Sequence, residues 1–71
     1  MKVNRDQIAK NLVSLRGNHT QAYLAKELGI AQSTYALYEM GKRVPGDDMK
    51  ATIAAYYGKT VQEIFFTSII A

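Results

Sequence analysis

The chain has no cysteine, no tryptophan, one histidine and one proline among its 71 residues. The absence of cysteine excludes disulfides and thiolate metal sites, and a single histidine does not supply the ligands of a usual zinc site. No apolar run approaches the roughly 20 residues that span a bilayer. Residues 1–4 lead into a charged segment rather than the apolar segment of a secretory leader. We therefore expect a cytoplasmic protein with no metal, no cofactor and no membrane contact.

The length and charge of the chain limit the size of its fold and the kinds of partner that it can bind. Seventy-one residues form one small domain, and a domain of this size buries only about 60% of the surface that its unfolded chain exposes. Without disulfides, its stability must come from helix packing, from oligomerisation or from both. The formal net charge is +3. A mildly basic balance permits nucleic acid, an anionic membrane surface or no specific partner.

Apolar residues recur at helical spacing along the whole chain, and glycines separate the periodic segments. Side chains suited to capping stand where the segments begin, and the run from Thr60 to Glu63 matches a capping box. No segment alternates with period two for long enough to indicate a strand, although the β-branched and aromatic run 64–70 leaves a terminal strand as an alternative. The sequence predicts an all-α domain with helices at Arg5–Arg16, Gln21–Leu28, Gln32 to about Met40, Asp47–Tyr57, and from Thr60 onward.

The segment from Leu24 to Pro45 contains two short helical stretches that meet at Gly29-Ile30-Ala31. Two helices joined by a three- to four-residue turn that contains glycine are typical of a helix-turn-helix. The break allows the second helix to enter a major groove while the first crosses the DNA backbone. On this interpretation Gln32 and Ser33 are the first side chains that meet base edges.

A longer pattern of residues goes beyond this generic motif. In order, the sequence contains Leu15-Arg16, Thr20-Gln21, Leu24-Ala25, Leu28-Gly29-Ile30, Ser33-Thr34, Glu39, Gly41-Lys42-Arg43, Pro45, Ala54 and Ile64-Phe65. This pattern resembles the phage-repressor/Cro (XRE-type) family of helix-turn-helix proteins over about residues 5–66. The resemblance implies a compact, five-helix, lambda-repressor-like DNA-binding domain that occupies residues 1–71, with the helix-turn-helix at about 21–40.

The resemblance also implies roles for individual residues. Gln21 is similar to the glutamine that binds a DNA phosphate and supports the next glutamine, and Gln32 is similar to the one that reads a base. Glutamine pairs well with adenine, and apolar side chains contact the thymine methyl group. Arg16 and Glu39 resemble an internal ion pair between the first and third helices. The expected DNA-binding residues are Gln21, Gln32, Ser33, Thr34, Ala36, Leu37, Lys42 and Arg43.

Ala31 and Met40 are among the positions that depart from the family pattern. Ala31 stands where a serine or threonine commonly caps the recognition helix, which costs about 1 kcal/mol. Met40 replaces a polar residue that often binds phosphate in the family. We assign no DNA contact to Met40.

The C-terminal segment 61–71 is rich in large apolar side chains, and one small core cannot easily bury all of them. Exposed apolar patches usually mark an interface, and family members commonly dimerise near this end. We therefore expect a homodimer whose contact includes Ile64, Phe65, Phe66, Ile69 and Ile70.

These observations favour a sequence-specific, double-stranded DNA-binding transcriptional regulator, a repressor that acts as a homodimer on an inverted repeat, of bacterial or phage origin. Two alternatives remain open: an antitoxin that binds both a toxin protein and DNA, and a controller protein of a restriction–modification system. An enzyme is not expected. The adjacent Asp47 and Asp48 would point about 100° apart on a helix, so they indicate a helix start rather than an acid–base pair.

Overall fold

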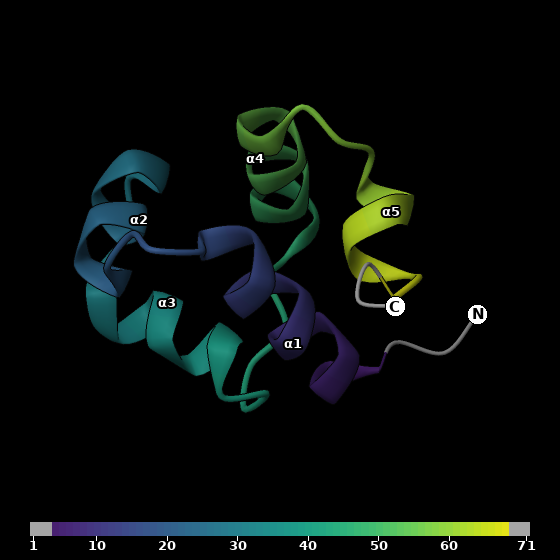
Figure 1. The fold of residues 1–71 in the computed structure, drawn as a ribbon, viewed down its shortest axis with the longest axis horizontal. Helices are drawn as coiled ribbons and strands as arrows, with labels where there is room; N and C mark the ends of the chain where they lie inside the picture. Colours follow the sequence, from purple (N-terminus) through teal and green to yellow (C-terminus); the bar gives the residue numbers. More distant parts are fainter. Residues whose placement is uncertain (1–3, 69–71) are drawn as a thin grey trace.

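The computed structural model describes residues 4–68, which fold into five helices on short turns (Figure 1). No strand occurs among these residues, and none of their helices has the length and apolar character needed to cross a membrane. The all-α fold class is therefore confirmed. The helices are α1 (Arg5–Arg16), α2 (Gln21–Leu28), α3 (Gln32–Glu39), α4 (Asp47–Tyr57) and α5 (Val61–Phe65).

Side-chain caps explain why three of these helices begin where they do. The Asn4 side chain accepts a hydrogen bond from the backbone N–H of Gln7, and Thr20 accepts one from Tyr23, both at 3.0 Å. At α5 the Thr60 hydroxyl accepts from the Glu63 N–H, while the Glu63 carboxylate accepts from the Thr60 N–H. The predicted capping box is therefore present. These caps satisfy backbone donors that a helix start otherwise leaves open.

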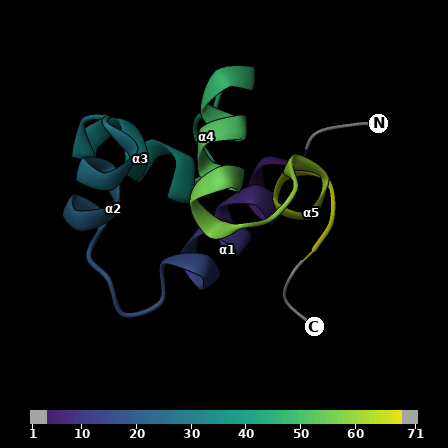
Figure 2. The same ribbon diagram turned by 90° about the horizontal axis from the view of Figure 1, so that it is seen from above.

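The helices enclose one small apolar core. Helices α2 and α3 lie on one side of α1, and α5 lies on the other (Figures 1 and 2). Helix α1 packs on α3 and α5, and α4 packs on α2 and α5. The buried apolar side chains come from all five helices: Ile8, Leu12, Leu24, Ala25, Leu28, Tyr35, Tyr38, Ile53, Ala54, Ile64 and Phe65.

The C-terminal helix corrects one expectation from the sequence. Ile64 is 0% exposed and Phe65 3% exposed, so both side chains belong to the core of the single chain and are not free to form a dimer contact. The reason is that α5 is only five residues long and seats both side chains among α1 and α4. Phe66 ends the helix and is half-buried against the core. Ile69 and Ile70 lie outside the described residues.

A buried asparagine fastens this helix to α1. Asn11 is 0% exposed, and its Nδ2 donates hydrogen bonds to the backbone carbonyls of Ile64 and Thr67, each at 2.7 Å. Its Oδ1 accepts from Gln7 Nε2 at 3.1 Å. A buried amide is tolerated because these groups are paired. Asn11 therefore sets where the chain runs as it leaves α5.

Replacing Asn11 by alanine should lower the free energy of unfolding by about 2–3 kcal/mol, because one buried and one partly buried carbonyl lose their donor and a small void forms. Urea unfolding measured by circular dichroism tests this. The exposed Asn18→Ala variant is the matched control and should stay within about 0.5 kcal/mol of wild type. An Asn11→Ala variant as stable as that control would contradict the role of Asn11 in fixing α5 to α1.

Candidate nucleic-acid interface

The turn between α2 and α3 separates two helices that could otherwise form one. Gly29 adopts a left-handed conformation, with φ 73° and ψ 31°. The N–H of Ile30 then returns to the carbonyl of Ala25 at 2.9 Å, which closes the end of α2. Ile30 packs against the core from within the turn. A side chain at position 29 would meet no atom within 4 Å, so the requirement for glycine comes from its backbone conformation.

Helix α3 has an inner and an outer face. Tyr35 is 1% exposed and Tyr38 4% exposed, so these two side chains fix the inner face in the core. On the outer face Gln32 and Ser33 are exposed at the start of the helix. Three further residues expected at DNA lie half-buried along α3: Thr34, Ala36 and Leu37.

The start of α3 also leaves backbone donors available. Ala31 is the N-cap and makes no side-chain capping hydrogen bond. The first N–H groups of a helix have no partner within the helix, and they favour anionic oxygens. The start of α3 therefore combines two exposed polar side chains with uncapped backbone N–H groups.

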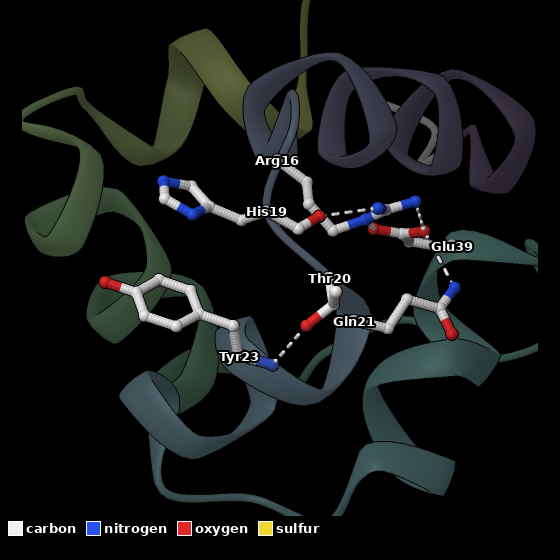
Figure 3. A network of polar contacts seen from close by, with 6 residues as sticks. All are labelled: Arg16, His19, Thr20, Gln21, Tyr23 and Glu39. Atoms are coloured by element: carbon white, nitrogen blue, oxygen red, sulfur yellow. Dashed lines mark hydrogen bonds and ion pairs between the residues drawn. The ribbon is translucent and has the colours of Figure 1, made fainter.

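The Glu39 carboxylate at the end of α3 joins three parts of the chain (Figure 3). Its Oε2 lies 2.7 Å from Arg16 Nε, so the expected ion pair is present. Its Oε1 accepts from Arg16 Nη2 at 3.0 Å and from Gln21 Nε2 at 2.9 Å. Arg16 Nη1 donates to the carbonyl of His19 at 2.8 Å. The end of α1, the loop that follows it, the start of α2 and the end of α3 are thereby connected.

Burial and hydrogen bonding act in opposite directions on this carboxylate. The Glu39 side chain is only 3% exposed, and burial alone would raise its pKa. Hydrogen bonds from Arg16 and Gln21 outweigh burial, so the pKa of Glu39 lies below its ordinary value. The same bond to Glu39 raises the pKa of Arg16. Glu39 and Arg16 are therefore both charged at neutral pH.

Two tyrosine hydroxyls are buried near this pair. Burial, followed by the nearby Glu39 carboxylate, raises the pKa of Tyr35 far above its ordinary value. Burial and the neighbouring Tyr56 raise the pKa of Tyr57 to about 12. Within residues 4–68 neither hydroxyl has a partner at hydrogen-bonding geometry. Both phenols are neutral at physiological pH and add no charge to the surface.

Gln21 differs from its expected role. The resemblance implied that it supports Gln32, but its amide donates to Glu39, and no bond between Gln21 and Gln32 occurs in residues 4–68. The Gln21 side chain extends toward the end of α3 while Gln32 lies at its start, and the support of Gln32 by Gln21 stays a prediction. The spacing of residues along the sequence could not reveal that Gln21 would donate to Glu39 rather than contact Gln32.

The basic turn after α3 is held against α1. The N–H groups of Lys42 and Arg43 both return to the carbonyl of Leu37, at 3.0 and 3.3 Å. Gly41 has φ 71°, and a Cβ added there would lie 3.2 Å from Asp6 Oδ1. Both basic side chains are exposed. The turn thus presents two cations directly after the outer face of α3.

Comparison with known families gives one match: the family model described as helix-turn-helix matches residues 14–64. No curated protein and no solved structure matches the chain. The match covers most of the chain, including the α2–turn–α3 unit and the Glu39 contacts. The chain belongs to the helix-turn-helix family of the XRE type and is a DNA-binding regulatory protein. That family is regulatory rather than catalytic.

The acidic and histidine side chains do not assemble into another kind of site within the described residues. Among residues 4–68, no three His, Cys, Asp or Glu side chains lie close enough together to hold a metal ion. Asp47 and Asp48 lie in the first turn of α4, where acidic side chains suit the helix dipole.

Replacing Glu39 by glutamine should lower the free energy of unfolding by about 2 kcal/mol at neutral pH, since Arg16 keeps its charge and loses a carboxylate. The folded-state pKa of Glu39 lies below its unfolded value. Its stabilising contribution is therefore complete above the unfolded pKa and is lost as the pH falls through the folded pKa. Urea unfolding at a series of pH values measures both effects.

The exposed Glu27→Gln variant is the matched control for this experiment. It should unfold within about 0.5 kcal/mol of wild type at neutral pH. The Glu39→Gln variant should also lose less stability on acidification than wild type. If both variants unfolded alike and with the same acid dependence, the carboxylate would not connect the helices as described.

Proposed function

We propose that the chain is a sequence-specific transcriptional repressor that binds double-stranded DNA as a homodimer at an inverted repeat. The observation that carries the proposal is the division of α3 into a buried and an outer face. Tyr35 and Tyr38 fix the helix in the core, while Gln32 and Ser33 at its start are exposed. A helix held in this way can enter a major groove without disturbing the core.

The outer face offers groups for reading bases. The Gln32 amide can donate to N7 of adenine and accept from the N6 amino group of the same base, which is the pairing that glutamine makes best. Ala36 and Leu37 are half-buried apolar residues one turn further along, and they suit a thymine methyl group. Ser33 and Thr34 add hydroxyls at the start of the helix. We place sequence discrimination on these five side chains.

Other groups suit the phosphate backbone. Lys42 and Arg43 are exposed on a turn whose backbone is fixed by hydrogen bonds to Leu37. Gln21 lies in the first turn of α2, where backbone N–H groups favour phosphate, and its amide already donates to Glu39. We therefore propose that Gln21 contributes through its position at the helix start, and that Lys42 and Arg43 supply the salt-dependent part of the affinity.

The homodimer is proposed from the needs of DNA recognition and from the remaining apolar surface at the end of the chain. Two copies would present recognition helices about 34 Å apart, one turn of DNA, and so would read two half-sites. With Ile64 and Phe65 buried, Phe66 is the partly exposed member of the expected dimer contact among the described residues. Its ring also lies 5.5 Å from Lys50 Nζ. We place the contact around Phe66. Occupancy of an operator that overlaps a promoter is enough to block transcription, so we propose repression.

Two substitutions should separate base reading from backbone contact. Gln32→Ala should weaken binding to the preferred site by about 1–3 kcal/mol and relax the preference at one base pair. Arg43→Ala should weaken binding to all sequences alike and flatten the dependence of affinity on salt. Fluorescence anisotropy with preferred and scrambled duplexes, over a range of salt, measures both. Uniform weakening by Gln32→Ala would contradict the assignment of α3 as the base-reading helix.

Selection of binding sites from random duplex DNA, at about 0.1 M salt, tests the proposed function as a whole. An enriched inverted repeat with half-sites about one turn apart is the expected result. An enriched single half-site, with a monomer by sedimentation at tens of micromolar protein, would remove the homodimer. No enrichment would overturn sequence-specific recognition.

A further inference from the structure

A second exposed feature lies on α2, on α4 and on the loop before α2. We call it the tyrosine patch, and it consists of His19, Tyr23, Glu27 and Tyr56. Tyr23 is 42% exposed and Tyr56 39% exposed, both high for large apolar side chains. Tyr23 and Glu27 are four residues apart on α2 and so lie on one face of that helix. Helix α2 packs against α4, which carries Tyr56.

Ring contacts hold the two tyrosines in place. The His19 ring stacks on Tyr23 with centroids 4.5 Å apart and an interplanar angle of 17°. The Tyr56 ring meets the half-buried Tyr57 edge to face at 5.0 Å. Aromatic pairs at these separations are attractive. The patch is therefore a supported surface rather than a set of loose side chains.

The patch lies apart from the groups assigned to DNA. In Figure 3, His19 and Tyr23 point to the side of α4, whereas Gln21 and Glu39 lie on the side of α3. A chain bound to DNA through the outer face of α3 would leave the tyrosine patch accessible. The patch is consequently available for a second partner.

The chemistry of the patch is electron-rich in an otherwise basic protein. Desolvation, followed by the nearby Tyr23 phenol and Glu27 carboxylate, raises the pKa of Tyr56 above its ordinary value. Among residues 4–68, Glu27 belongs to no ion pair. Phenol rings present negative faces, and the carboxylate adds a full negative charge, so a phosphate backbone is disfavoured here.

We propose that the tyrosine patch binds an arginine side chain of a partner protein. A guanidinium is planar and weakly hydrated, stacks on aromatic faces and bonds a carboxylate through two N–H groups. The Tyr23 and Tyr56 rings and the Glu27 carboxylate offer both kinds of contact on two helices that pack against each other. A lysine ammonium would gain the charge interaction without the stacking. The patch thus gives the regulator a docking point for an arginine-bearing segment while α3 faces DNA.

Selection from a display library of random twelve-residue peptides on the immobilised full chain tests this inference. Wild type is compared with the Tyr23→Ala/Tyr56→Ala and Tyr23→Phe/Tyr56→Phe double variants and with Glu27→Gln. Lys26→Ala, an exposed charge on the same helix, is the matched control. Circular dichroism and DNA binding verify that each variant is folded, since none of these residues is assigned to DNA.

Peptides that wild type selects and the double alanine variant loses should contain arginine, with affinity falling by about tenfold. The phenylalanine variant should keep them because it retains both rings, Glu27→Gln should weaken them, and Lys26→Ala should leave them unchanged. The inference is overturned if the alanine variant selects the same peptides as wild type, or if the peptides it loses lack arginine. Because DNA binding is measured on the same variants, either result is distinguishable from a failure of the proposed repressor function.

Discussion

The buried Glu39 carboxylate is the contact on which the arrangement of the helices depends. Helix α3 is eight residues long and begins without a side-chain cap, and a helix that short is not stable by itself in water. Its inner tyrosines anchor it to the core, but they fix only one face. The Glu39 carboxylate accepts three hydrogen bonds from Arg16 and Gln21 and so fixes the end of α3 against α1 and α2. The direction in which the outer face points follows from this contact.

At the other end of the molecule, a polar side chain likewise fixes a short helix whose apolar side chains lie in the core. Asn11 fixes α5 and the residues just after it to α1, and Ile64 and Phe65 complete the core. A domain of this size has few buried side chains, so each helix must contribute to the one core. Because Ile64 and Phe65 belong to the core, Phe66 is the partly exposed member of the expected dimer contact among the described residues. The core and any dimer contact therefore draw on neighbouring residues of one short segment.

Local signals in the sequence predicted most of the fold. Caps at Asn4, Thr20 and Thr60 and the glycines after α2 and α4 act within a few residues, so the helix bounds follow from short-range chemistry. The burial of Ile64 and Phe65 depends on the space between α1 and α4, and no local sequence pattern predicts that space. The hydrogen bonds of Asn11 to α5 and the residues after it were not predicted for the same reason, since the partners of Asn11 lie 53 and 56 residues away.

The candidate site was partly predictable in the same sense. The two faces of α3 follow from helical spacing, and family resemblance indicated the pairing of Arg16 with Glu39. The bond from Gln21 to Glu39 arises only when α2 meets α3. It depends on a contact between helices rather than on a pattern along one helix.

Backbone amide chemical-shift mapping, with the isotope-labelled chain and a selected operator duplex, tests whether α3 is the helix that meets DNA. The largest changes are expected at residues 32–37, at the start of α2 and at Lys42 and Arg43, with small changes in α5. Changes centred on α4 and α5, with the α3 amides unaffected, would contradict the assignment of α3 as the DNA-reading helix.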